Sequence, residues 1–98
     1  MSDMTKQEVT TKDNIAVFKA LADPIRLEIV RYLNRLDHEV ACGEIGQAMQ
    51  ISKTSGSYHF KILQEAGLIT AHKVAREKYV TLDRSTFDHY LTHFWQNL

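Results

Sequence analysis

The chain has 98 residues, of which 44% are hydrophobic and 24% are charged, and its formal net charge at pH 7 is zero. This composition is typical of one small globular domain and excludes a disordered chain, and no apolar run approaches the roughly 20 residues needed to cross a bilayer. The single cysteine, Cys42, excludes an internal disulfide, and because residues 1–12 lack the apolar core of a secretory signal, we expect a cytoplasmic protein that does not bind a membrane.

The charges are unevenly distributed along the chain. Residues 53–78 contain five bases and two acids, whereas residues 1–52 contain six bases and eight acids. The five bases within residues 53–78 are Lys53, Lys61, Lys73, Arg76 and Lys78. One surface can therefore attract phosphate although the whole chain is neutral.

The first predicted helix follows an N-terminal tail. We expect residues 1–12 to be a flexible tail and residues 13–98 to form one domain. The helix starts after Asp13 and carries Ile15, Phe18 and Ala22 on one face.

A stronger helical signal follows in ADPIRLEIVRYLNRL. Asp23 is a suitable N-cap, Pro24 takes the first helical position, and apolar residues then recur at helical spacing. A short helix from about Cys42 to Met49 comes next, and a bend at residues 50–52 leads into a further helix.

This further helix, in ISKTSGSYHFKILQEAGLI, has two distinct faces. Its small and apolar residues fall within one narrow sector: Gly56, Phe60, Leu63 and Gly67. Its polar residues lie on the opposite side: Thr54, Ser57, Tyr58, Lys61 and Glu65. Short hydroxyl side chains let a helix approach a base edge or a phosphate closely. The spacing alone is equally consistent with a merely solvated face.

A basic hairpin is predicted after that helix. GLITAHKVAREKYVTL contains two β-like runs, Leu68–Val74 and Lys78–Leu82, joined by residues 75–77 without a glycine. A short helix, a bend, a second helix and a hairpin form a winged helix-turn-helix. The predicted fold is therefore mainly α (α+β), with about five helices and a two-stranded β-hairpin wing.

These segments resemble the ArsR/SmtB family of bacterial and archaeal transcriptional regulators. The resemblance rests on FKALADPIRLEIVRYL, on GEIGQAMQISKTSGSYHFKILQEAGLI and on a wing ending in KYVTLD. It implies a homodimeric repressor that releases its operator when an effector binds. In that picture the helix beginning near Lys53 is the recognition helix, and the first and last helices build the dimer interface. Gly56 departs from the family, which usually has an apolar branched residue there.

The expected contacts with double-stranded DNA divide into two sets. The bases that we expect to neutralise phosphates are Lys53, Lys61, Lys73, Arg76 and Lys78. The residues that we expect to read base edges are Thr54, Ser55, Ser57 and Tyr58. A winged helix that binds protein instead of DNA is the main alternative, and it predicts an apolar or acidic recognition face. An enzyme is not expected, because the chain has no Gly-rich phosphate loop and no nucleophile with a base at motif spacing.

The last predicted helix, in STFDHYLTHFWQNL, indicates a dimer. Its apolar residues recur at i, i+3, i+4, i+7, i+8 and i+11: Phe87, Tyr90, Leu91, Phe94, Trp95 and Leu98. Ile15 and Phe18 extend this surface. The stripe either packs on its own domain or meets the same helix of a second subunit, and we predict the second arrangement.

The metal sites found in many members of the family are not expected here. In EVACGEI the two positions of the Cys-x-Cys ligand pair are Ala41 and Gly43, and Cys42 falls between them. One thiolate cannot supply the three or four ligands that a soft metal requires. Cys42 is therefore interpreted as a small, partly buried apolar residue, with a reactive thiol as the alternative.

The second family site, an Asp-x-His on the last helix, is also missing. Arg84 and Thr86 occupy its first two positions, which leaves His89 and His93 at i, i+4 spacing. A metal-responsive repressor that uses these histidines stays an alternative, but no cofactor is expected. The sequence does not identify a small-molecule effector, for which a cavity between the first and last helices is the expected place.

Overall fold

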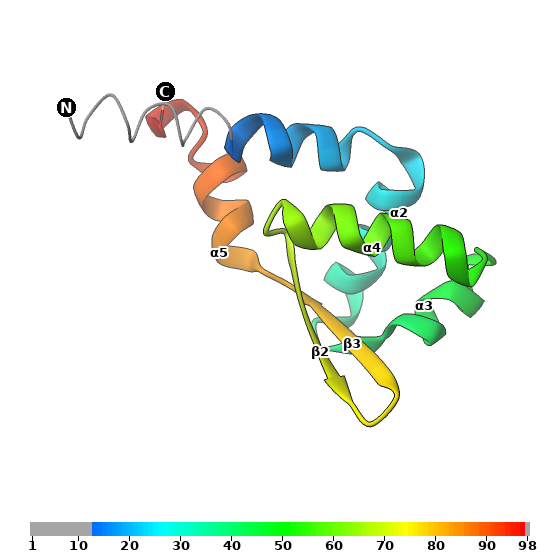
Figure 1. The fold of residues 1–98 in the computed structure, drawn as a ribbon. Helices are drawn as coiled ribbons and strands as arrows, with labels where there is room; N and C mark the ends of the chain where they lie inside the picture. Colours follow the sequence, from blue (N-terminus) through cyan, green and yellow to red (C-terminus); the bar gives the residue numbers. More distant parts are fainter. Residues whose placement is uncertain (1–12, 98) are drawn as a thin grey trace.

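The computed structural model describes residues 13–97, so the expected tail at residues 1–12 and Leu98 lie outside the described residues. The described chain is helical from residue 13 to residue 21. The elements that follow are α2 (Pro24–Leu36), β1 (Val40–Ala41), α3 (Cys42–Met49), α4 (Lys53–Glu65), β2 (Ile69–Val74), β3 (Glu77–Leu82) and α5 (Arg84–Phe87). In Figure 1, α4 crosses the middle of the molecule and the β2–β3 hairpin extends beyond the helices as a wing. The predicted winged helix-turn-helix is confirmed.

The start of α2 follows the predicted capping pattern. The Asp23 carboxylate accepts hydrogen bonds from the backbone N–H groups of Ile25 at 2.9 Å and Arg26 at 3.0 Å. The hydrogen bond from the Arg26 N–H is the main reason why the pKa of Asp23 is lowered. Pro24 occupies the beginning of the helix, where its missing N–H has no intrahelical partner to lose.

The sheet is larger than the expected two-stranded wing. Its three antiparallel strands have the order β1-β3-β2, and Val40 and Ala41 of β1 pair with Val80 and Tyr79 of β3. A strand of two residues is too short to show an alternating pattern of apolar and polar residues, so only its pairing with β3 reveals it.

The wing also has a tighter turn than predicted. Val74 pairs with Glu77, so the turn consists of Ala75 and Arg76 and the second strand begins at Glu77 instead of Lys78. Ala75 adopts a φ of 57°, which is in the left-handed region. This conformation costs a non-glycine residue about 1–2 kcal/mol.

One hydrophobic core joins the helices to the sheet. Its buried members are Val17, Ala20, Ile29, Leu33, Val40, Ile45, Phe60, Leu63, Leu68, Ile69 and Val80. The first helix contributes Val17 and Ala20 to this core, while Ile15 and Phe18 of its predicted apolar face are exposed. Ala22 lies in the bend after that helix and not on its face.

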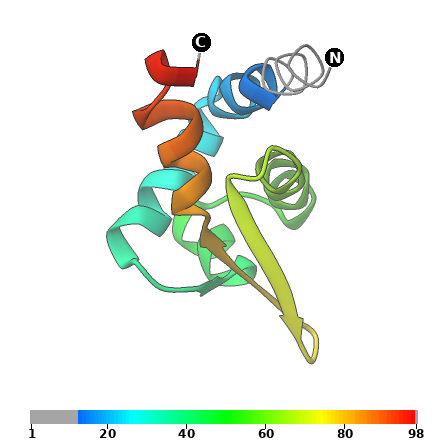
Figure 2. The ribbon, with the colours of Figure 1, turned by 90° about the vertical axis from the view of Figure 1, so that its left-hand side faces the viewer.

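The prediction of one regular C-terminal helix is wrong. After α5 the chain forms a π-helix at Asp88–Thr92 and a 3₁₀-helix at Trp95–Asn97. The His93 N–H donates to the Asp88 carbonyl at 2.9 Å, which is the i→i+5 bond of a π-turn. This wider turn changes the helical phase between Phe87 and Trp95. In Figures 1 and 2 the C-terminal segment lies beside the first helix, far from the tip of the wing.

Candidate nucleic-acid interface

The turn between α3 and α4 sets the position of α4. Gln50 adopts a left-handed conformation with a φ of 56°, and the Ile51 N–H donates to the Gly46 carbonyl at 3.0 Å. The Ser52 hydroxyl then accepts from the Ser55 N–H at 3.1 Å, which caps α4. The chain therefore leaves α3 and enters α4 through defined local hydrogen bonds.

The two predicted faces of α4 are separated in the structure. Gly56, Phe60 and Leu63 are buried in the core, whereas the polar row is exposed: Thr54, Ser57, Tyr58, Lys61 and Glu65. Tyr58 has 60% of its surface exposed. Ser55 is half-buried, so it is less accessible than Thr54, Ser57 or Tyr58. Gly67, predicted on the inner sector, comes after the end of α4 and adopts a φ of 79°.

The basic residues of the wing lie beside this row. Lys73 of β2 stands directly opposite Lys78 of β3. This pair lies on the same face of the hairpin as the pair Ala71 and Val80, and nearer to the tip. Among residues 13–97, none of the bases Lys53, Lys61, Lys73, Arg76 and Lys78 forms an ion pair. Like charges placed directly across a hairpin are destabilising, so this arrangement favours an anionic partner.

A buried polar contact, which the sequence analysis did not predict, connects the inner side of α4 to the start of α2. The Arg26 side chain donates through Nε to the Ala20 carbonyl at 2.6 Å and through a terminal nitrogen to the Lys19 carbonyl at 3.3 Å. Its other terminal nitrogen lies 3.1 Å from Nδ1 of His59, on the inner side of α4. Arg26 thus joins the end of the first helix to α4. The sequence offered one indication that Arg26 would be buried: it lies one turn before Ile29, on the same face of α2.

The guanidinium defines the hydrogen-bonding role of the histidine ring in this contact. An arginine nitrogen can only donate, so His59 accepts through Nδ1. The Asp23 carboxylate lies 3.9 Å from the same ring nitrogen. His59, which is 6% exposed, is therefore a packing and positioning residue and not part of the outward row.

Cys42 begins α3 and is half-buried against the core, as its interpretation from the sequence predicts. Burial raises the pKa of its thiol, and the nearby Lys78 ammonium opposes that change. The thiol is therefore predominantly protonated at neutral pH. Within the described part of the chain, no group of three or more His, Cys, Asp or Glu side chains is placed to hold a metal ion.

The residues predicted to form a dimer interface divide into two groups. Phe87, Tyr90 and Leu91 are partly buried and pack against the core of their own domain. Outside the core, Ile15, Phe18 and Trp95 are 50%, 44% and 84% exposed. The rings of Phe18 and Phe94 meet edge to face with their centroids 5.3 Å apart.

A polar contact also ties the C-terminal segment to the first helix. The Tyr90 hydroxyl donates to the Asp13 carboxylate at 3.0 Å. Burial, followed by this acidic partner, raises the pKa of Tyr90. The first helix and the C-terminal segment are therefore in contact, and both expose aromatic side chains.

These features define the chain as a winged helix-turn-helix transcriptional regulator. A family model described as a helix-turn-helix domain matches residues 21–72. The HTH-type transcriptional regulator YceK of Bacillus subtilis strain 168 is 44% identical over 97 residues, which cover 99% of this chain and 97% of that protein.

One further relative and one solved structure are also similar to this chain. The arsenical resistance operon repressor of B. subtilis is 36% identical over 81 residues, or 83% of this chain and 75% of the repressor. The structure of HlyU from Vibrio cholerae N16961 has a TM-score of 0.69 and 28% identity, covering 87% of this chain and 92% of HlyU. The chain therefore belongs to the ArsR/SmtB family of transcriptional regulators.

Membership in this family has two direct consequences. The chain is a regulator and not an enzyme, in agreement with the prediction. Regulators of this family bind DNA through the helix-turn-helix unit. In addition, no helix within residues 13–97 is long and apolar enough to cross a membrane.

Proposed function

We propose that this chain is a homodimeric repressor that binds an inverted-repeat operator and is released by a signal other than a metal ion. The observation that carries the proposal is the exposed row of Thr54, Ser57, Tyr58 and Lys61 beside a basic hairpin. Family membership supports the choice of DNA as the partner.

The two sets of contacts would have different tasks. Thr54, Ser57 and Tyr58, with Ser55 at their edge, would read base edges in the major groove, where the donor and acceptor patterns differ between base pairs. Lys53 and Lys61 on α4 and the wing bases Lys73, Arg76 and Lys78 would bind phosphates. The wing would lie along the backbone or in the neighbouring minor groove.

The dimer would form through the first helix and the C-terminal segment. Ile15, Phe18 and Trp95 expose apolar surface on these two segments, and Phe94 packs against Phe18 between them. Burying such aromatic surface against a second copy would stabilise the dimer by about 25 cal/mol per Å². Two-fold symmetry would then separate the recognition helices by about 34 Å, which is one turn of DNA.

The choice of a repressor without a metal rests on relatives and on residues. The arsenical resistance protein and SdpR of B. subtilis, which is 37% identical over 67 residues, are both named repressors. Ala41 and Gly43 occupy the positions of the family's cysteine ligands. His89 and His93 belong to no described group of three possible ligands, so a metal response through them is less well supported.

The experiment is a selection of bound sequences from a random duplex DNA library, with the mass of the protein measured in solution at the same salt concentration. Recovery of an inverted repeat bound by a dimer is the expected result. Absence of any motif, together with no binding at about 50 mM salt, would contradict the proposal, because phosphate contacts are strongest at low salt. The protein-binding winged helix would then be the better interpretation.

A further inference from the structure

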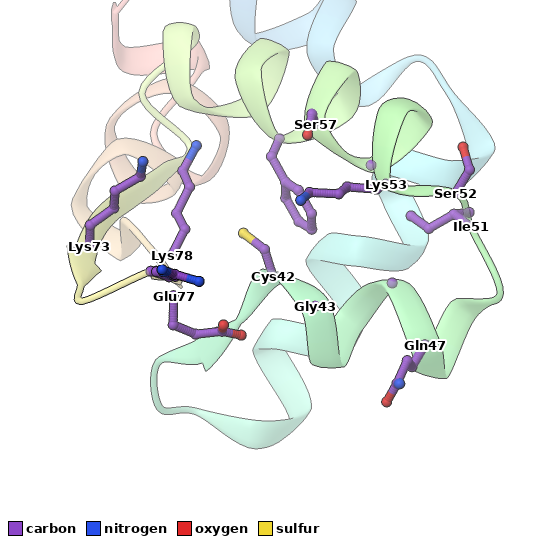
Figure 3. Close-up of a pocket in the computed structure, with 14 residues that line it drawn as sticks. Cys42, Gly43, Gln47, Ile51, Ser52, Lys53, Ser57, Lys73, Glu77 and Lys78 are labelled. Carbon is purple, nitrogen blue, oxygen red and sulfur yellow. The ribbon is translucent and has the colours of Figure 1, made fainter.

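The space between the wing and the helix-turn-helix pair is a recessed pocket of about 640 Å³. Its walls come from α3, from the beginning of α4 and from both strands of the wing (Figure 3). Small-molecule sites commonly have volumes of about 300–1,000 Å³. In the proposed function the lysines at the rim of this pocket bind DNA, but the interior of the pocket has no role.

The floor of the pocket is apolar. Phe60 is 3% exposed, and Ile51 and Cys42 are half-buried. Figure 3 shows the Cys42 sulfur directed into the space between the wing and α4. Since the thiol has a raised pKa, it adds no negative charge at neutral pH.

Gly56 leaves this floor open. A Cβ atom at this position would lie 3.6 Å from Cε2 of Phe60 and 3.7 Å from Cδ1 of Ile51, which are ordinary contact distances. Packing therefore does not require a glycine, although glycine in a helix interior is about 1 kcal/mol less favourable than alanine. The missing side chain leaves room at this wall of the pocket for one more apolar contact.

The rim of the pocket carries bases on two sides and one acid, Glu77 of β3. Lys73 and Lys78 stand opposite each other on the face of the wing that carries Ala71 and Val80, so they extend this face beyond the core and over the pocket. Lys53 reaches toward the same space from α4 (Figure 3). Among the described residues these three lysines have no ion-pair partner.

We propose that this pocket binds a small organic anion. Lys53, Lys73 and Lys78 would hold its phosphate or carboxylate group, and its apolar body would lie against Phe60 and Ile51. A DNA phosphate would satisfy the lysines but would make no apolar contact with the residues that line the floor, which is why a ligand with both parts fits better. The ligand class is therefore an aromatic or aliphatic phosphate or carboxylate.

The consequence for DNA binding rests on the proposed function. The same three lysines are assigned to DNA phosphates there, so a bound anion would compete with the operator for them. Linkage requires the reverse effect too: bound operator would weaken the affinity for the anion by the same factor. The pocket would thus be the effector site of the regulator.

The first test measures binding by calorimetry to the full chain with four probes: phenyl phosphate, benzoate, inorganic phosphate and phenol. Phenyl phosphate or benzoate is expected to bind at least about tenfold more tightly than inorganic phosphate and phenol, because only they occupy both rim and floor. The first two probes distinguish a phosphate from a carboxylate. If inorganic phosphate binds as tightly as either, the pocket is only a seat for DNA phosphate and the proposal is overturned.

Variants locate the site. Gly56→Val fills the floor and is expected to lower the affinity for the better probe about tenfold while the protein still binds DNA. Lys78→Met is expected to weaken both the probe and DNA. Lys61→Met is the matched control, since Lys61 does not line the pocket, and it should weaken DNA alone. Unchanged probe binding in Lys78→Met would overturn the assignment, and Gly56→Ala repeats the occlusion test if the valine variant does not fold.

Competition is measured by fluorescence anisotropy of a labelled selected duplex at constant ionic strength. Saturating probe is expected to lower the DNA affinity of the original protein and not that of Gly56→Val. If DNA binds but no probe does, this inference fails and the proposed function stands. If the probe binds but no DNA sequence does, the proposed function and the competition fail, while the anion site is supported.

Discussion

The two ends of the molecule differ in how much of their apolar surface is buried within one chain. The recognition end, residues 42–82, buries its large apolar side chains wholly or partly, apart from Val74, and exposes its polar row, including Tyr58, and its basic wing. The terminal end, formed by the first helix and residues 84–97, leaves Trp95 84% exposed and Phe18 44% exposed. A polar surface can remain in water without cost, whereas an aromatic surface gains free energy from being covered. The recognition end therefore exposes mainly polar and basic side chains, whereas the exposed Trp95 and Phe18 make the terminal end suited to contact with a second copy.

The largest expected effect comes from a charge at the terminal end. Trp95→Glu should convert the dimer to a monomer and lower the affinity for an inverted repeat at least about 100-fold, because the two half-sites are no longer bound together. Sedimentation and DNA titration measure the two changes. Tyr58→Ala, a change at an exposed aromatic of the recognition end, should leave the mass unchanged. A dimeric Trp95→Glu protein would place the interface elsewhere.

The next effect tests the link between the two ends. Arg26→Met removes the donors to the Ala20 and Lys19 carbonyls and the contact with His59, and should lower the free energy of unfolding by about 3 kcal/mol. Urea unfolding measures this change. Arg31→Met provides the control, since Arg31 only pairs with Glu28 at the surface and should contribute less than about 1 kcal/mol. Equal losses in the two variants would show that the buried contact is not a structural link.

Within the recognition end, two variants separate base reading from phosphate binding. Tyr58→Ala should relax the sequence preference by about 1–3 kcal/mol at the base pair that it reads. Arg76→Ala should weaken binding to all sequences about equally and reduce the salt slope by about one. Titrations of matched and mismatched duplexes at several salt concentrations measure both quantities. Equal loss of preference in the two variants would refute this division.

The smallest expected effect concerns the cap of α4. Ser52→Ala removes the acceptor for the Ser55 N–H and should lower the free energy of unfolding by about 1 kcal/mol. Ser57→Ala changes an exposed serine of the same helix and should alter stability by less than about 0.5 kcal/mol. Thermal unfolding of both variants provides the comparison, and similar midpoints would mean that the cap contributes little.

Sequence patterns predicted the recognition end more accurately than the terminal end. Within the recognition end Ser52 acts through a hydrogen bond to a residue three positions away, and the cap of α2 by Asp23 and Pro24 is equally local, so local rules were sufficient for both helix starts. The two faces of α4 also follow from helical spacing alone. At the terminal end the predicted apolar stripe depended on the spacing of a regular α-helix. The π-turn at Asp88–Thr92 changes the direction in which the later side chains point, so the stripe is not continuous.

The amino-acid sequence by itself determined the helix-turn-helix pair, the polar row of α4 and the basic character of the wing, because periodicity and capping are local properties. Only the tertiary structure decided the pairing of β1 with β3, the contact between Arg26 and His59, and the pocket beneath Lys73 and Lys78. Each of these joins segments far apart in the chain. Their partners are selected by the packing of one shared core, and no local pattern specifies such a choice.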